Sequence, residues 1–71
     1  MFYRFLLTNC DPTTLTIPNV AAAQADTVTD AVAQFERKHG MKVDYVKNGE
    51  AWLTLKDGAT VRYLVNAGDE R

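Results

Sequence analysis

The chain has few of the residues that carry out catalysis or bind metals. Its 71 residues include one cysteine, Cys10, and one histidine, His39, so no internal disulfide can form and no His or Cys pair has metal-ligand spacing. A Cys10–His39 dyad would need a third group to orient the imidazole. We interpret the two residues as a loop thiol and a histidine that complements a helix dipole. We therefore expect no enzyme activity, no cofactor and no metal site.

The chain also lacks a strong net charge and any long hydrophobic run. Eight Lys and Arg against nine Asp and Glu give a net charge of −1, whereas nucleic-acid and membrane-surface binders usually need a basic excess. The apolar run Met1–Leu7 contains Arg4 and is too short for a signal peptide or a membrane span. Together with the single cysteine, these features favour a cytoplasmic protein without a membrane partner.

The short length allows one small domain. We assign residues 1–65 to it and residues 66–71 to a flexible C-terminal tail. The apolar fraction of 46% is ordinary for a globular protein, but 71 residues bury only a modest core. A protein partner or a second copy of the chain would therefore stabilise it.

The clearest structural signal is a three-stranded meander between Met41 and Val65. Apolar and polar residues alternate in each strand, and the turns contain Asn48-Gly49 and Asp57-Gly58, which are strong hairpin signals. A two-residue type I′ turn would pair Tyr45 with Trp52. A three-residue loop with a G1 bulge would instead keep every odd-numbered apolar residue on one face, so we predict G1 bulges at both glycines.

The predicted register places Trp52 on the even-numbered face of the meander. Its cross-strand neighbours there would be Asp44 on one side and Arg62 on the other. Arg62 directly across from Trp52 is well placed for a cation–π contact.

The N-terminal half predicts two strands and a helix. Met1–Thr8 alternates as a strand, and Asn9–Pro12 turns. Thr13–Ile17 forms a second strand, and Pro18 after it indicates an edge strand or a bulge. Val20–Ala25 is compatible with more strand or with an early helix, and we interpret it as an irregular continuation of the edge strand. The helix is predicted from an N-cap at Thr27 to a stop at Gly40.

These elements predict an α+β fold, a two-layer sandwich of order ββαβββ. One amphipathic helix would pack on the odd-numbered face of a largely antiparallel five-stranded sheet, with the apolar first strand at its centre. The predicted core is Tyr3, Phe5, Leu7, Leu15, Ile17, Val28, Val32, Phe35, Val43, Tyr45, Leu53, Leu55, Val61, Tyr63 and Val65.

The other sheet face is the candidate site, because one helix covers only one side. Aromatic residues and arginines on an open surface are typical of interface hot spots, although scattered apolar residues on a solvated face are also ordinary. Val46 is expected on the same face. The predicted partner-binding residues are Phe2, Arg4, Leu6, Asp44, Trp52, Arg62 and Leu64.

The functional hypothesis is a small regulatory or accessory module that binds a protein partner or a second copy of itself. An alternative is single-stranded nucleic-acid binding, with Trp52 and Phe2 as stacking platforms and Arg4, Arg62, Lys42 and Lys56 on the backbone. A further alternative, compatible with the small size, is a phage- or mobile-element-type modulator of a host protein.

Overall fold

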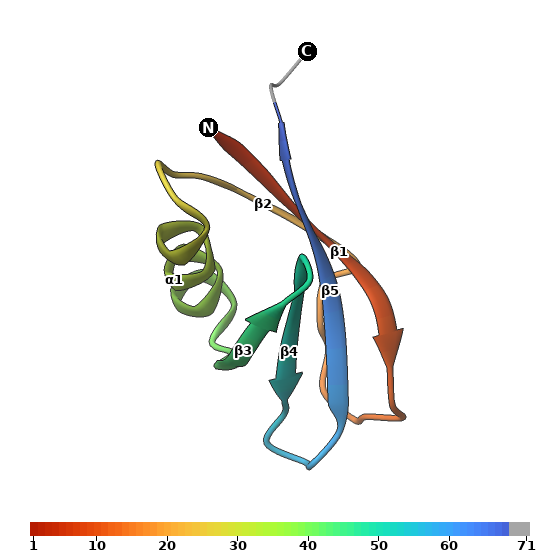
Figure 1. Ribbon diagram of the computed structural model, residues 1–71. Coiled ribbons are helices and arrows are strands. Elements are labelled where there is room, and N and C mark those ends of the chain that lie inside the picture. The colour runs from red at the N-terminus through yellow and green to blue at the C-terminus, as the bar shows by residue number, and fades with distance from the viewer. Residues whose placement is uncertain (69–71) are drawn as a thin grey trace.

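A computed structural model describes residues 1–68 as five strands and one helix (Figure 1). The helix lies against one side of the antiparallel sheet, which confirms the predicted α+β architecture of order ββαβββ. The elements are β1 Phe2–Cys10, β2 Val20–Gln24, α1 Val28–His39, β3 Val43–Lys47, β4 Glu50–Thr54 and β5 Thr60–Gly68.

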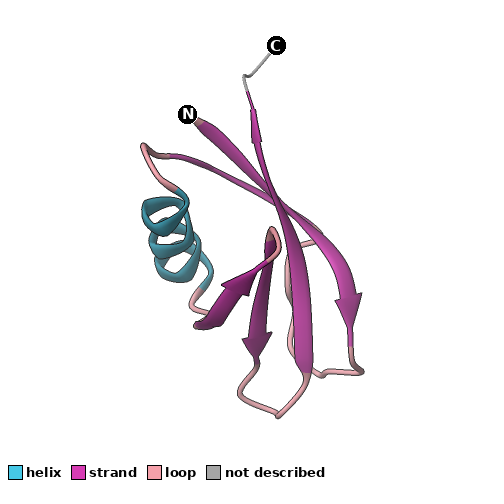
Figure 2. Ribbon diagram, viewed as in Figure 1, coloured by secondary structure: helices cyan, strands magenta, loops and turns pink. Residues whose placement is uncertain are grey.

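The strands are ordered β2-β1-β5-β4-β3, so β2 and β3 form the two edges of the sheet. The first strand was predicted to be central. It is an interior strand, but the middle position belongs to β5, which pairs with β1 on one side and β4 on the other. Both β1 and β5 are nine residues long, and together they form the long twisted centre of the sheet (Figure 2).

The helix begins and ends as its sequence predicts. The Thr27 side chain accepts a hydrogen bond from the backbone N–H of Asp30, and Gly40 ends the helix in the left-handed conformation. Glu36 joins the helix to the next strand, because its carboxylate accepts the N–H of Val43 at 2.7 Å. Within residues 1–68, no helix has the length and apolar character needed to span a membrane.

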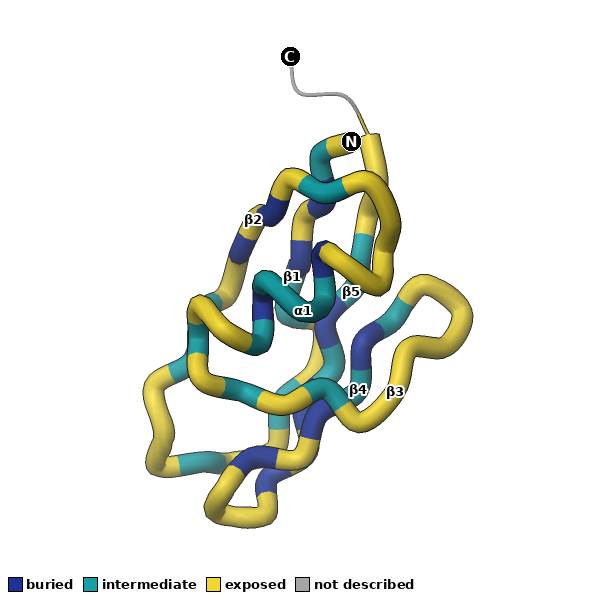
Figure 3. The backbone as a smooth tube through the Cα atoms, turned by 90° about the vertical axis from the view of Figure 1, so that its left-hand side faces the viewer, coloured by how far each residue is buried: buried dark blue, intermediate teal, exposed yellow. Residues whose placement is uncertain are grey.

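The core lies between α1 and the odd-numbered face of the sheet. Phe35 of the helix stacks on Phe5 with ring centroids 4.6 Å apart, and it meets the edge of Tyr63 at 5.0 Å. Figure 3 shows the buried positions alternating along the strands beneath the helix. Period-two burial of this kind is expected of a sheet that is covered on one face.

The predicted strand at Thr13–Ile17 is wrong, because this segment is a loop. Asp57, in the β4–β5 turn, holds this loop through hydrogen bonds. Its carboxylate accepts one from the Thr13 hydroxyl and one from the Thr14 N–H. The Thr13 hydroxyl also accepts the N–H of Leu15, a local turn that competes with strand pairing. The edge strand is Val20–Gln24 instead, and it is regular.

The two hairpins use different turns, so one of the two predicted G1 bulges is wrong. Lys47 pairs with Glu50 across a two-residue turn, with Asn48 at φ 54° and Gly49 at φ 77°, as in type I′. At the second turn the Leu55 N–H donates to Ala59 and Gly58 has φ 90°, which confirms the predicted three-residue loop.

A bulge at Asp44 lets the start of β3 keep its place in the core despite the two-residue turn. Val43 pairs with Leu53, as predicted, but the extra residue in β3 shifts the next pair to Tyr45 and Trp52. Tyr45 therefore leaves the predicted core and is 50% exposed, whereas Val46 turns to the helix side of the sheet.

Two further predicted core residues are not buried. Leu15 is 38% exposed in its loop, and Val28 is 39% exposed in the first turn of α1. Five alanines outside the predicted core set are also buried: Ala21, Ala23, Ala31, Ala51 and Ala59. Ala21 and Ala23 lie in β2, the strand that the helix packs against, where small side chains let the two elements approach closely.

The last strand is longer than predicted. Asn66, expected in the flexible tail, pairs with Arg4, and Gly68 pairs with Phe2. Pairing with β1 therefore extends the sheet beyond the predicted boundary at Val65. The rest of the predicted tail, residues 69–71, lies outside the described residues.

Candidate interaction surface

The side of the sheet opposite α1 is termed the open face. It carries the side chains that alternate with the core residues, together with two residues placed there by their cross-strand partners. All seven predicted partner-binding residues lie on this side, but in separate groups. The open face includes Phe2, Arg4, Leu6, Val20, Asp44, Tyr45, Glu50, Trp52, Thr54, Arg62 and Leu64.

The centre of the open face is a row of three side chains from three adjacent strands. Trp52 of β4 pairs with Tyr45 of β3 and with Arg62 of β5. The Tyr45 and Trp52 rings stack 5.6 Å apart with 10° between their planes. The Arg62 guanidinium carbon lies 4.8 Å from the centroid of the indole, which is the predicted cation–π contact.

The indole nitrogen of Trp52 has no hydrogen-bond partner. Its Nε1 atom is buried, and no acceptor among residues 1–68 reaches it. A buried donor without a partner costs about 1–3 kcal/mol. The indole is thus held by its ring contacts rather than by its polar atom.

A second row, of aliphatic side chains, lies beside the first. Leu6 of β1 pairs with Val20 of β2 and with Leu64 of β5. Val20 is 62% exposed, the largest exposure of the three, while Leu6 and Leu64 are half-buried. Leu64 is two residues from Arg62 on the same strand, so the aliphatic and aromatic rows adjoin.

Phe2 and Arg4 lie at the far end of the open face. The Arg4 guanidinium carbon is 6.0 Å from the Phe2 ring centroid, at the limit of a cation–π contact. Both residues line a shallow hollow of about 150 Å³ together with Asn66, Ala67 and Gly68. Leu6 follows Arg4 on the same strand, so this pair adjoins the aliphatic row.

Asp44 does not lie beside Trp52, contrary to the prediction. The bulge moves it along β3, where its carboxylate accepts the Thr54 hydroxyl at 2.8 Å. The neighbour of Trp52 on that side is Tyr45, so the indole stands between a ring and a cation rather than between two opposite charges.

Tyr45 and Val20 also belong to this surface, although neither is among the predicted partner-binding residues. Tyr45 could have been found only by taking the type I′ alternative at Asn48-Gly49, which pairs it with Trp52. Val20 could have been found by reading Val20–Gln24 as a regular strand. In both cases the signal was local, but the choice depended on which strands pair.

Groups with reactive side chains lie elsewhere in the fold. Cys10 ends β1, where its thiol donates to the Asp11 carbonyl, and the His39 ring lies 5.0 Å from that of Phe35. Burial, with a smaller effect of Cys10, raises the pKa of Tyr63 to about 12. Among residues 1–68, no three His, Cys, Asp or Glu side chains are grouped so as to hold a metal ion.

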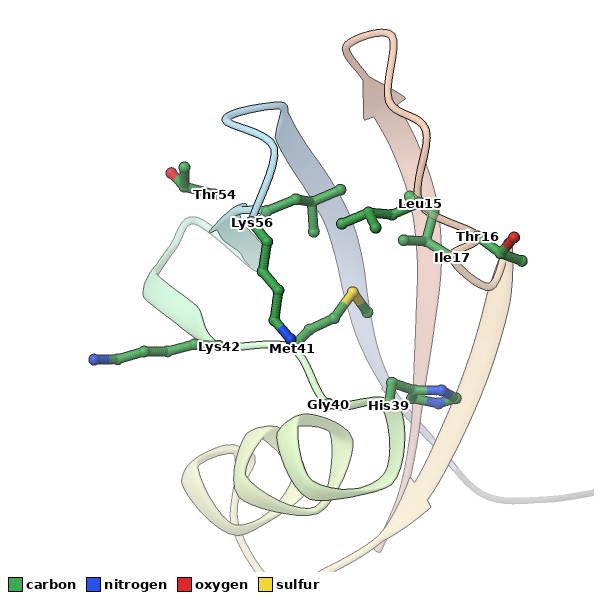
Figure 4. Close-up of a pocket in the computed structure, with 10 residues that line it drawn as sticks. Leu15, Thr16, Ile17, His39, Gly40, Met41, Lys42, Thr54 and Lys56 are labelled. Carbon is green, nitrogen blue, oxygen red and sulfur yellow. The ribbon is translucent and has the colours of Figure 1, made fainter.

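A separate groove of about 340 Å³ lies at the end of α1, on the helix side (Figure 4). Its apolar wall includes Met41, Leu15 and Leu55, and Lys42 and Lys56 stand at its margins. None of Tyr45, Trp52 and Arg62 lines this groove.

Comparisons of the chain with protein-family models, with curated proteins and with solved structures gave no match.

Proposed function

We propose that the chain is a small, non-enzymatic interaction module whose open face binds a protein partner, with a second copy of the chain as the first partner to test. The observation that supports this most strongly is the Tyr45–Trp52–Arg62 row beside the aliphatic residues Leu6 and Leu64. Tryptophan, tyrosine and arginine are the residue types that dominate binding energy at protein interfaces.

The charges on the open face suit a partner that presents both signs. Arg62 and Arg4 are cationic, whereas Asp44 and Glu50 are anionic. A symmetric dimer needs a surface that complements itself, and a face with both signs meets that requirement. A chain of this size also gains stability when its apolar surface is covered.

The ring geometry supports a protein partner better than single-stranded nucleic acid. Base stacking needs an open aromatic face, but Tyr45 covers one side of Trp52 and Arg62 approaches the ring from the other strand. Nucleic-acid binding through this face, including Phe2 as a second platform, is therefore an alternative outcome of the experiment below.

The test is the mass of the purified chain as a function of concentration, by size-exclusion chromatography with light scattering. The monomer is 7.9 kDa, and we expect the mass to rise toward twice that value. Trp52→Ala should lower self-association at least about tenfold, since loss of a hot spot costs about 2 kcal/mol or more. Tyr45→Lys at a half-exposed edge position should do the same with little risk to the fold.

Val28→Ala is the matched control, because it removes an exposed apolar side chain from the helix side. Circular dichroism establishes that each variant is folded. Self-association would be contradicted by a mass that stays monomeric at millimolar concentration. The wider proposal would be contradicted if the Trp52 variant also kept every protein partner of the unchanged chain, and a salt-dependent gel shift that needs Trp52 would favour nucleic acid.

A further inference from the structure

The outer edge of β2 is a second recognition element, on a different part of the molecule from the Trp52 row. β2 is the last strand of the sheet on its side, and Figure 3 shows it at the margin beside α1. We propose that β2 accepts an extended, acidic segment of a partner protein as an additional antiparallel strand.

The hydrogen bonds that flank β2 show which backbone groups point outward. The Leu7 N–H donates to the Asn19 carbonyl, and the Ala25 N–H donates to the Met1 carbonyl. Both pairs belong to the register that joins Phe5 to Ala21, so in β2 the odd-numbered residues bond toward β1. Residues alternate in direction along an antiparallel strand, so the even-numbered residues direct their N–H and C=O groups to the outer side.

Three residues thus form the outward-facing row: Val20, Ala22 and Gln24. The Gln24 carbonyl already accepts a hydrogen bond from the Gln34 side chain at 2.8 Å. An added strand would meet the backbone groups of Val20 and Ala22 first, with Gln24 at the end of the row.

The other edge of the sheet is protected along its length against such pairing, whereas on β2 the helix covers the Gln24 end and leaves Val20 and Ala22 open. β3 carries a bulge at Asp44 and a lysine at Lys47, and bulges and charges are the usual devices that prevent edge-to-edge association. The β2 segment Val20–Gln24 has no charge, no proline and no break in its register. Only one edge of this sheet is therefore shaped to accept a strand.

The charge beside the β2 edge indicates what kind of strand fits. A shallow groove of about 430 Å³ follows the edge on the helix side, and it is lined by Ala22, Ala23, Gln24, Gln34, Arg37 and Lys38. Both charged residues in this lining are cationic and exposed, whereas Asp26 and Asp30 line the next hollow, beyond Gln24 near the start of α1. Side chains of an added strand alternate between the two faces, so those on the helix side would meet Arg37 and Lys38 and should be acidic.

The same charges argue against a second copy of the chain at this edge. Pairing of β2 with β2 about Ala22 would bring the Arg37 and Lys38 side chains of both copies to the same side of the joint. Like charges placed opposite one another destabilise a pair. The side chains on the other side of the added strand would lie beside Val20 on the open face, where β-branched residues suit a sheet.

The experiment uses the ¹⁵N-labelled full chain and two synthetic heptapeptides, acetyl-Val-Glu-Thr-Glu-Thr-Glu-Val-amide and its counterpart with Lys in place of Glu. We expect the acidic peptide to shift the amide resonances of Val20 and Ala22 and to bind about tenfold more tightly than the basic one, with salt weakening the difference. No shift along β2, or equal binding of the two peptides, would overturn the proposal.

Two variants separate the backbone and charge contributions. Ala22→Pro removes an outward N–H without removing a bond to β1, so the acidic peptide should bind about tenfold more weakly, while Ala22→Val keeps the N–H and should bind within about twofold. The double variant Arg37→Glu/Lys38→Glu changes two exposed residues of the helix. It should reverse the preference between the two peptides. It also tests the proposal if the proline variant fails to fold.

Peptide binding that Ala22→Pro or the double charge reversal leaves unchanged would overturn the proposal. A doubled mass that Ala22→Pro abolishes would overturn the choice of partner, because it would show β2 pairing between copies. Trp52→Ala should leave peptide binding unchanged, so failure at this edge is distinguishable from failure of the open-face proposal.

Discussion

Tyr63 is the largest side chain that the core buries completely. Its hydroxyl donates to the Pro18 carbonyl at 2.6 Å, which ties β5 to the loop that precedes β2. The same burial disfavours the phenolate and raises the pKa of Tyr63 from 10.0 to about 12. One residue thus couples packing, loop position and alkaline stability.

The raised pKa predicts how stability falls at high pH. A group whose pKa is higher in the folded chain contributes stability below its unfolded pKa and loses it as pH rises through the folded value. Stability should therefore decline between pH 10 and about 12. Tyr63→Phe should lower the free energy of unfolding by about 1 kcal/mol at pH 8 through the lost hydrogen bond. Between pH 8 and pH 12, however, the free energy of unfolding should fall less in the variant than in the unchanged chain.

The measurement is urea unfolding of both proteins from pH 8 to 12, with tyrosinate absorbance to follow ionisation. The two proteins differ only at residue 63, so the difference between the curves isolates the contribution of Tyr63. Parallel curves above pH 10 would contradict the assigned burial effect.

At the scale of elements, the β3–β4 hairpin shows how a turn and a bulge act together. The type I′ turn would place the apolar residues of β3 on the wrong face, and the bulge at Asp44 returns Val43 to Leu53. The cost is that Tyr45 leaves the core, where it then stacks on Trp52. The candidate interface is thus a consequence of the turn geometry.

The turn predicts a specific response at Asn48. Its φ of 54° lies in the left-handed region, which asparagine adopts more readily than alanine. Asn48→Ala should lower the free energy of unfolding by about 1 kcal/mol, whereas Asn48→Gly should change it by less than about 0.5 kcal/mol.

Urea unfolding of these variants beside Lys47→Ala, an exposed neighbour, provides the check. If Asn48→Ala were no worse than Lys47→Ala, the two-residue turn would be wrong and the three-residue loop would regain support.

The element types were largely predictable from local pattern, and the pairing details were not. The helix cap at Thr27, the stop at Gly40 and the G1 bulge at Gly58 depend on neighbouring residues only, and all are confirmed. The strand expected at Thr13–Ile17 failed because Asp57, more than 40 residues away, binds its backbone. Alternation alone could not reveal a competing partner so far along the chain.

The sequence predicted which sheet face carries the candidate site, but not which of its residues are neighbours. Trp52 and Arg62 occupy even-numbered strand positions, which placed both opposite the helix, and the structure brings them into contact. The bulge then replaced Asp44 with Tyr45 beside the indole. A single inserted residue in an edge strand has no sequence signature apart from the pairing that it alters.

At the scale of the whole molecule, Asp57 joins the β1–β2 loop to the β4–β5 turn. Its carboxylate accepts hydrogen bonds from Thr13, Ala59 and Thr14, and these bonds lower the pKa of Asp57, that from the Thr13 hydroxyl having the largest effect. The contact closes the end of the fold that α1 does not reach, since the helix packs nearest β2.

The lowered pKa predicts acid sensitivity at this end of the fold. A group whose pKa is lower in the folded chain contributes stability above its unfolded pKa, and that stability is lost as pH falls through the folded value. Asp57→Asn should therefore be less stable than the unchanged chain at pH 7, with the difference shrinking below about pH 4.

Thermal unfolding from pH 2 to 7 tests this, with Lys56→Gln as a control that alters charge in the same turn without touching Thr13. A stability difference for Asp57→Asn that stays constant down to pH 2 would show that the charge of the carboxylate does not hold the loop.

The sequence by itself determined the helix, its two ends, the β4–β5 turn and the sheet face on which most side chains lie. Capping, turn chemistry and period-two alternation act over only a few residues. Only the tertiary structure decided the strand order, the loop at Thr13–Ile17, the bulge at Asp44 and the contact of Tyr45 with Trp52. These depend on which distant backbone groups compete for the same hydrogen bonds, and that competition is settled only when the whole sheet assembles.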